Sequence, residues 1–447
     1  MSTLLRRLGA RLAGLSERWI PDAFVFAILL TLAVFLLALL ATDRGAAALV
    51  GDWYGGFWNL LEFGMQMTLV LVTGHALATA PPVGRMLRRV AALPSGGPSA
   101  VAMTAAASAL FGLVHWGLGL VTGAMLAREV ARSARRRGIP VHLPLLAAAG
   151  YLGLMVWHSG LSGSAPLLVN TPGHFLEARL GLVPLEQTIF RPSNLLFVGI
   201  VLLTAPALLA AMHPPPEDVL EIGEDDEPPL STGPVALHLA PAERLAHSRA
   251  LVLVILAGAL AYVVPHFLRA GLLAVDLNLV NFCFLMLGLA LHGTLASYAG
   301  ATMEGARAAA GVIVQFPFYA GIMGLMVHSG LVRVVADAFT AVATPGTFPA
   351  LVMTSAALIN LAVPSGGGQW AVQGPIVVEA AGALGVDQGR AIMAVAIGDQ
   401  LTNMIQPFWA LPLLGITGLR AGQILGYTGA VMAVAYVGAV VALTWAR

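Results

Sequence analysis

Residues 348–382 read FPALVMTSAALINLAVPSGGGQWAVQGPIVVEAAG. The stretch is almost wholly apolar up to Val363 and again after Trp370, but Pro364, Ser365 and three successive glycines separate the two parts. Proline and glycine destabilise a helix interior, so the pattern predicts two helices joined by a break. Inside a lipid bilayer, broken backbone is tolerated only where it is buried in protein or lines a watery cavity.

The composition of the whole chain is that of a protein that crosses a membrane many times. Hydrophobic residues make up 58% of the 447 residues, charged residues only 10%, and the mean hydropathy is +0.85. Soluble domains carry about 25% charged residues, and about 20 apolar residues cross a bilayer as a helix. We therefore expect an all-α polytopic membrane protein with about nine transmembrane helices plus two re-entrant hairpins. The expected transmembrane helices lie near 22–42, 57–79, 143–170, 193–212, 249–268, 275–297, 308–328, 391–416 and 424–446.

Two polar segments lie outside these helices. Residues 1–19 are amphipathic, contain four arginines and lack a signal-peptide cleavage pattern, which favours a cytoplasmic lead-in. Residues 213–248 contain three consecutive prolines and an acidic cluster, the composition of a solvated cytoplasmic linker. An alternative is that this acidic segment binds a partner.

Arginines flank an apolar stretch in the first half. Arg85, Arg88 and Arg89 precede residues 100–127, and five more arginines follow by position 137. Positive residues favour the cytoplasmic side, so both ends should lie inside. Because two crossings need about 20 residues each, this stretch is too short for them and predicts a re-entrant hairpin. Its tip should fall near residues 112–119.

The second half shows the same pattern as the first. Gly150 and Gly398 each begin a long span interrupted by polar residues, and each follows a predicted hairpin. An odd number of crossings between the copies would invert the second one, the design of many secondary transporters. The arginines of the second half do not show a matching sidedness. The expected units are a first repeat (20–212, hairpin near 100–127), the linker (213–248), a connecting helix (249–268) and a second, inverted repeat (269–447, hairpin near 348–382).

Four segments combine helix breakers with polar groups at membrane depth. Free N–H groups at a helix start bind carboxylates, and side-chain and backbone oxygens suit Na⁺. A carboxylate inside the membrane costs so much free energy that Asp399 is expected to serve a function. His158 is of a residue type that titrates near neutral pH. The candidate binding residues are His115, Trp116, Gly117 and Gly119 at the first tip; Ser365, Gly366, Gly367, Gly368, Gln369 and Trp370 at the second; Trp157, His158, Ser159 and Ser162; and Asp399, Asn403, Gln406 and Pro407.

Simpler interpretations compete with each of these roles. Small residues often mark helix crossings in membranes, and tryptophan is common at membrane interfaces. His158 would then be a hydrogen-bonded structural residue, and Asp399 would stabilise a helix start.

Several classes of protein are excluded or disfavoured. The single cysteine, Cys283, rules out an intrachain disulfide and a cysteine-based metal site. The chain has no lysine, which excludes a P-loop ATPase, and it has no His-Glu-x-x-His motif. The sequence also lacks the cluster of basic residues that is typical of nucleic-acid binding proteins. Transport would therefore draw on an ion gradient or on substrate exchange.

Long strings of this sequence resemble the short-chain fatty acid transporter family of bacteria. The strings are WIPD (19–22), FWNLL (57–61), FGMQM (63–67), GLGLVTGAM (117–125), AREV (127–130), VQFPFYAG (314–321), VPSGGG (363–368), QGP (373–375) and QPFWALP (406–412). The resemblance implies uptake of acetoacetate, butyrate or similar monocarboxylates across the bacterial cytoplasmic (inner) membrane. It also implies kinship with the ion transporter superfamily, whose members use paired hairpins and often form dimers. His115 stands where the family leads us to expect an amide side chain, and His158-Ser159 interrupts a more glycine-rich run.

We expect a substrate carboxylate to lie on the amides of residues 365–368 and of the opposed tip at 117–119. Gln369, Asn403, Gln406 and Ser162 would shape the polar side, and the tryptophans would contact a short alkyl tail. Candidate Na⁺ ligands are Ser162, Ser365 and Asn403. Asp399 and His158 could instead carry a proton, so H⁺ remains an alternative coupling ion. No organic cofactor is expected, and the expected partners are the substrate, the bilayer and a second copy of the chain.

Three alternatives remain open at this stage. A dicarboxylate or other organic-anion carrier on the same scaffold would want an additional cationic or amide-rich contact. An intramembrane enzyme would use His158 and Asp399 for catalysis. A non-catalytic sensor or scaffold would use the acidic linker to bind a partner.

Overall fold

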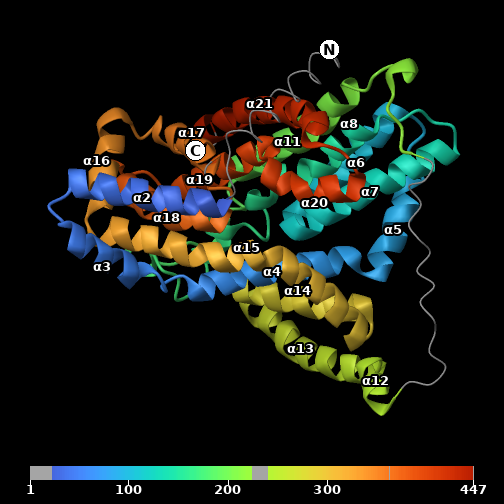
Figure 1. The fold of residues 1–447 in the computed structure, drawn as a ribbon, viewed down its shortest axis with the longest axis horizontal. Coiled ribbons are helices and arrows are strands. Elements are labelled where there is room, and N and C mark those ends of the chain that lie inside the picture. The colour runs from blue at the N-terminus through green and yellow to red at the C-terminus, as the bar shows by residue number, and fades with distance from the viewer. Residues whose placement is uncertain (1–22, 224–239, 362, 446–447) are drawn as a thin grey trace.

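The computed structural model describes residues 23–223, 240–361 and 363–445. Throughout these ranges the chain forms helices and connecting loops, and it contains no strand (Figure 1). Together with the apolar length of its helices, this confirms an all-α polytopic membrane protein. The predicted lead-in 1–19 and residues 224–239 of the predicted linker 213–248 lie outside the described residues.

The first half consists of helices of very different length. They are α2 (Ala23–Ala41), α3 (Ala46–Gly56), α4 (Leu61–Thr79), α5 (Pro81–Ala91), α6 (Gly97–Val114), α7 (Trp116–Arg136), α8 (Leu143–Gly150), η1 (Tyr151–Met155), η2 (Trp157–Ser159), α9 (Ser164–Leu168), α10 (Glu177–Leu180), η3 (Leu185–Gln187) and α11 (Pro192–Ala211).

The second half also contains long helices, a broken helix pair and an interrupted segment, in the same order along the chain. Its helices are η4 (Pro216–Asp218), α12 (Pro241–Ala246), α13 (Arg249–Ala270), α14 (Leu277–His292), α15 (Leu295–His328), α16 (Leu331–Val342), α17 (Phe348–Asn360), α18 (Gly366–Leu384), α19 (Gln388–Thr402), η5 (Asn403–Ile405), α20 (Pro407–Thr417) and α21 (Ala421–Trp445). This order agrees with the predicted inverted repeat, which stays a prediction.

Among the described residues, six helical segments are long and apolar enough to cross a membrane, and the bent pair α3–α4 would be a seventh. Two predicted spans, 22–42 and 275–297, correspond to shorter apolar helices, Ala27–Ala41 and Leu277–His292. The predicted span 391–416 is divided into α19, η5 and α20. The number of membrane crossings therefore stays a prediction.

Both predicted hairpins are pairs of helices joined by extended backbone. His115 separates α6 from α7 with φ −161° and ψ 120°, and Ser365 precedes α18 with φ −155° and ψ 105°. In the first hairpin the two helices pack against each other, whereas α17 packs mainly against α19. The glycines and the proline predicted the second break, because a helix cannot continue through them.

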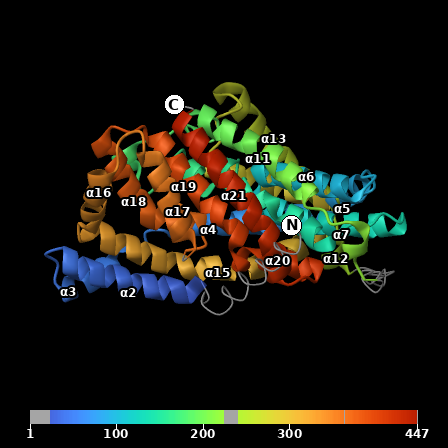
Figure 2. The same ribbon diagram turned by 90° about the horizontal axis from the view of Figure 1, so that it is seen from above.

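The two interrupted segments meet at the centre of the molecule. The segment α8–η1–η2–α9 contacts the first hairpin, and its short 3₁₀ helices also contact α19 and η5 of the other half. Figure 1 shows α4 and α15 running beside each other across the molecule, with α6 to α8 towards one end and α16 to α18 towards the other. Viewed from above in Figure 2, α21 crosses the middle and covers the interrupted segments.

Close backbone contact between α3 and α15 depends on glycine. A Cβ atom added to Gly56 would lie 2.5 Å from the Cα atom of Gly324. Any larger residue at either position would separate the helices, so the small residues here serve packing. This contact fixes α15, which contributes Phe316 to the site described below.

Candidate functional site

A small cavity lies where the start of α18 meets the two interrupted segments. About 30 Å³ of it is open to the centres of water molecules. A single buried water needs about 10–15 Å³ on this measure, so any organic occupant of the cavity in this conformation is small. The lining residues are Met67, Trp116, Leu154, Trp157, Ser164, Phe316, Ser365, Gly366, Gly367, Asn403 and Trp409.

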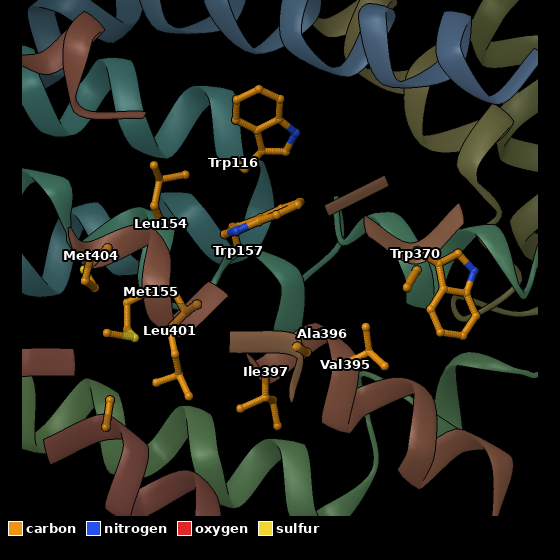
Figure 3. Packing of buried hydrophobic residues seen from close by; sticks show 14 of the residues in the cluster. Trp116, Leu154, Met155, Trp157, Trp370, Val395, Ala396, Ile397, Leu401 and Met404 are labelled. Atoms are coloured by element: carbon orange, nitrogen blue, oxygen red, sulfur yellow. The ribbon is translucent and has the colours of Figure 1, made fainter. Parts of the chain in front are cut away.

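Aromatic rings form one wall of the cavity. The ring centroids of Trp116 and Trp157 are 6.0 Å apart, and those of Trp116 and Trp409 are 5.4 Å apart, both edge to face. The Nε1 atom of Trp157 is buried and has no acceptor among the described residues. Trp370 lies apart from this group in Figure 3, and it is fully buried and does not line the cavity. The wall can therefore hold a short alkyl chain.

The first residues of α18 present backbone to the cavity. The Ser365 hydroxyl accepts a hydrogen bond from the Gly368 amide at 3.2 Å, which caps the helix. The Gly367 amide has no acceptor among the described residues, as is normal in the first turn. A Cβ atom on Gly366 would lie 2.6 Å from Trp157 Cη2, and one on Gly367 would lie 3.0 Å from the rings of Phe63 and Phe316. Glycine is thus required for the rings to reach the backbone.

The first hairpin tip is closed by its own side chains. Nδ1 of His115 accepts hydrogen bonds from the amides of Gly117, at 3.1 Å, and Leu118, at 3.4 Å. Ser162 Oγ accepts from the Trp116 amide at 2.9 Å, and the Gly119 amide donates to the His115 carbonyl at 2.8 Å. The structure therefore brings Trp116 to the cavity but uses the amides of Gly117 and Gly119 internally. Of the two tips, the second has the more open amides.

An amide network joins α17 to the interrupted segment of its own half. Asn360 Nδ2 donates to the Asp399 carbonyl, to Thr402 Oγ1 and to Asn403 Oδ1 at 2.8 to 3.0 Å. Gln406 Nε2 donates back to the carbonyls of Asn360 and Leu361. Gln406 thus binds the C-terminal end of α17, while Asn403 lines the cavity.

Two further predicted residues lie away from the cavity. Gln369 Nε2 donates to the Ala356 carbonyl at 2.9 Å and to Gln373 Oε1 at 3.0 Å, so it holds α18 against α17. Pro407 is the first residue of α20, where a missing N–H does no harm, and its side chain lies outside what the structure describes.

His158 and Asp399 form a buried pair between the two halves. Nδ1 of His158 lies 2.8 Å from Oδ2 of Asp399, and the two side chains are 0% and 1% exposed. Gln400 Oε1 accepts from the His158 amide, and Gln400 Nε2 donates to Ser159 Oγ at 2.7 Å. A catalytic histidine would face a nucleophile, but Nε2 of His158 accepts from the Ala165 backbone amide at 3.1 Å. The pair is therefore not arranged to activate a nucleophile in this conformation.

The three candidate Na⁺ ligands are not gathered into one cage. Ser365 and Asn403 line the cavity, whereas Ser162 does not. Each of the three side-chain oxygens already accepts one hydrogen bond from the protein. Among the described residues, no group of three or more histidine, cysteine or carboxylate side chains is placed to hold a metal ion.

A second cavity of about 100 Å³ lies next to the first. It is lined by Asn59, Glu62, Phe63, Gln66, Leu168, Thr171, Pro172, Gly173, His174 and Phe175. The Phe63 ring packs edge to face on Phe316, with centroids 5.6 Å apart, and Phe316 lines the central cavity. These two rings therefore separate the polar cavity from the central one.

Several residues of the site were not predicted from the sequence. Asn360 is the one amide side chain in the apolar run 348–363, which was a signal available for it. Gln400 directly follows Asp399, and Trp409 lies in the QPFWALP string, but neither was singled out. Met67 and Phe316 likewise lie in the FGMQM and VQFPFYAG strings, whereas Leu154 carries no local signal, because an apolar residue near a cavity looks like any other in a membrane helix.

The fold is shared with solved transporter structures at low sequence identity. MtrF of Neisseria gonorrhoeae, described as an antimetabolite efflux pump, superposes with a TM-score of 0.62 at 16% identity, covering 98% of this chain and 97% of that one. The YdaH transporter of Alcanivorax borkumensis gives 0.58 at 16% identity, covering 95% and 98%. At this identity the likeness concerns the fold alone.

Sequence relatives are much closer. A protein of Escherichia coli strain K12, named as a candidate short-chain fatty acid transporter, is 43% identical over 428 residues, 95% of this chain and 96% of that one. A protein of Haemophilus influenzae with the same name is 39% identical over 433 residues, with the same coverage of 95% and 96%. The family model described as short chain fatty acid transporter matches residues 4–446. The resemblance drawn from the sequence is confirmed, and the chain belongs to the short-chain fatty acid transporter family.

Proposed function

We propose that this protein is a secondary active carrier that takes up short-chain monocarboxylates, such as acetoacetate or butyrate, across the bacterial inner membrane. Its membership of a transporter family and its apolar helices support a multi-pass membrane carrier. An ion gradient, of H⁺ or of Na⁺, supplies the energy, and the protein works as a homodimer.

The small cavity at the start of α18 is the observation that carries the proposal. Its open Gly367 amide lies at the positive end of a 19-residue helix, where a carboxylate is stabilised. The tryptophan rings offer an apolar surface for a chain of a few carbons. Both ends of a short fatty acid thus find complementary groups.

The lining of the cavity favours one carboxylate over two. None of its lining residues carries a positive charge. A second carboxylate would be buried against tryptophan, methionine and leucine, and an unpaired buried charge is strongly unfavourable. We therefore place dicarboxylates second as substrates.

The first experiment measures exchange of radiolabelled butyrate and acetoacetate in proteoliposomes that hold purified protein. Unlabelled acetate, butyrate, octanoate and succinate are added as competitors. Butyrate and acetoacetate should exchange, and octanoate and succinate should compete poorly, because the cavity is short and uncharged. Strong competition by succinate would favour the dicarboxylate alternative, and no exchange of any of these acids would contradict the proposed function.

Two alanine variants on the same helix test the site itself. In Gly366→Ala the new methyl group clashes with Trp157, so exchange should fall by roughly tenfold or more. Gly382→Ala is the matched control, because a Cβ atom there meets nothing closer than 3.8 Å. Equal exchange by the two variants at equal abundance in the membrane would show that substrate does not pass the start of α18.

A further inference from the structure

The buried pair of His158 and Asp399 joins the two halves of the molecule beside the cavity. His158 lies in η2 of the first half, and Asp399 lies in α19 of the second half. Their 2.8 Å contact is inaccessible to solvent in this conformation. Nothing described so far uses this pair to bind substrate, so its role needs a separate account.

The hydrogen bonds of the histidine show which atom carries its proton. Nε2 of His158 accepts from the Ala165 amide, so it must hold a lone pair. Nδ1 therefore carries the ring proton and donates it to Oδ2 of Asp399. A second proton on Nε2 would face the Ala165 N–H group, so the neutral form of His158 is the one that fits this site.

The other oxygen of Asp399 is left without a partner. Oδ1 is buried, and no described residue donates a hydrogen bond to it. A buried carboxylate oxygen of this kind is costly unless a cation or a proton joins it. Oδ2 of the same carboxylate accepts from the N–H group of His158, and among the described residues Asp399 belongs to no group of three or more histidine, cysteine or carboxylate side chains, which favours a proton over Na⁺.

The elements packed around α19 carry one carboxylate, Glu379, which is held in an ion pair with an arginine. These elements are α9, α17, α18, α21, η1, η2 and η5. Besides His158 they carry only Tyr151, Tyr427, Tyr436 and Glu379 as titratable groups. Glu379 is half-exposed and pairs with Arg179 at 3.8 Å. Arg390 lies on α19 itself, nine residues before Asp399, and donates to the Leu443 carbonyl.

The pair touches the cavity through two contacts. The His158 ring stacks on the Trp157 ring with centroids 4.3 Å apart. A Cβ atom on Gly366 would lie 2.9 Å from Cε1 of His158, so the histidine also touches the first residue of α18. A change in charge at Asp399 therefore reaches both the aromatic wall and the start of the helix that faces the substrate.

We infer that Oδ1 of Asp399 binds the proton that is transported together with the carboxylate substrate. The inference rests on the proposed carrier function and specifies its coupling. A proton from one side of the membrane adds to the carboxylate to form a carboxylic acid, and the same proton leaves to the other side after the conformational change. His158 is a positioning residue, because it holds Oδ2 and directs the proton to Oδ1. One proton with one monocarboxylate anion moves no net charge.

The test compares exchange with net uptake in proteoliposomes. Exchange at equal pH on both sides reports the carrier, whereas net uptake driven by an imposed pH gradient reports coupling. Short fatty acids also cross lipid as neutral acids, so the rate in protein-free liposomes is subtracted from each value. In Asp399→Asn, net uptake should fall to the protein-free rate, and exchange should lose the dependence on pH that the wild type shows. Glu379→Gln, which removes the half-exposed carboxylate on α18, should keep both the net uptake and the pH profile of exchange.

Histidine variants provide a second measurement that does not depend on the aspartate variant folding. His158→Asn retains an N–H near the position of Nδ1 and should keep the pH profile of exchange, whereas His158→Phe should shift it. Wild-type uptake driven by a Na⁺ gradient and not by a pH gradient would overturn the inference, as would coupled uptake by Asp399→Asn. Both results leave the carrier function standing, whereas absence of exchange in the wild type would refute the carrier function itself.

Discussion

His115 shows how one side chain decides what a hairpin tip can bind. The family resemblance leads us to expect an amide side chain at this position, and the structure shows why an amide would fit. Nδ1 of His115 accepts from two backbone amides at the start of α7, the task that asparagine performs at many helix N-termini. The ring also packs edge to face against Phe284, with centroids 4.5 Å apart. We therefore interpret His115 as a cap that keeps the first tip closed.

This interpretation predicts the effect of two substitutions on stability. His115→Asn should keep the cap, whereas His115→Ala should lose it and lower the free energy of unfolding by about 1 kcal/mol. Thermal unfolding in detergent, followed by tryptophan fluorescence, measures the difference. If His115→Asn is as unstable as His115→Ala, the packing of the ring on Phe284 matters more than the cap.

At the residue scale, the sequence predicted residue types better than roles. Asp399 was expected at membrane depth, and the structure buries it next to His158, but their pairing joins positions 241 residues apart. Such contacts cannot be predicted from local pattern, because only the packing of the two halves creates them. Asn360 illustrates the same limit, since its three acceptors lie about 40 residues further along the chain, in α19 and η5.

At the scale of elements, the two hairpins are alike in sequence pattern and different in chemistry. Proline and glycine predicted the second break, because their backbone preferences act locally, whereas the flanking arginines and the short apolar stretch predicted the first. The pattern did not predict that Ser162 would close one tip while Ser365 leaves part of the other open. That difference depends on which loop packs against each tip, which is a property of the tertiary structure.

The difference between the tips predicts a difference in chemical accessibility. In a Cys283→Ser background, Ser365→Cys should react with a small methanethiosulfonate reagent, and butyrate should slow the reaction. Ser162→Cys should remain unmodified, because Ser162 is fully buried and does not line the cavity. Mass spectrometry of the intact protein gives the extent of labelling. Equal labelling of both positions, or no protection by butyrate, would contradict the assignment of the substrate to the second tip.

At the scale of the whole molecule, composition alone was enough to predict a polytopic α-helical membrane protein. The lipid environment imposes this outcome, because every backbone polar group must be bonded within the protein. The association of the linker with the helices was not predicted. Residues 213–222 lie against the ends of α7 and α8, where Leu143 donates to the Leu220 carbonyl at 2.8 Å and Ile222 is buried. An apparently solvated linker therefore begins with a docked segment.

Histidines hold this docked segment in place. The Leu220 amide donates to Nδ1 of His142 at 3.0 Å, and the His142 amide donates to Nε2 of His213 at 3.3 Å. His213 therefore carries its ring proton on Nδ1 and donates it to the Pro214 carbonyl. The guanidinium of Arg135 donates to the Ile222 carbonyl nearby. Burial lowers the pKa of His213 below its ordinary value of 6.5.

The lowered pKa of His213 predicts that acid releases the segment. Protonation of His213 is less favourable in the docked segment than in the released one. Docking is therefore at its full stability when the pH lies above 6.5, the ordinary pKa of histidine, and it weakens as the pH falls below that value. Hydrogen exchange of the amides of residues 217–222 should therefore be slow at pH 7.5 and, after correction for the intrinsic rate, faster at pH 5.5. His213→Gln keeps an acceptor for the His142 amide but does not titrate, so its protection should depend less on pH. If the variant shows the same loss of protection, protonation of His213 does not release the segment and the prediction is wrong.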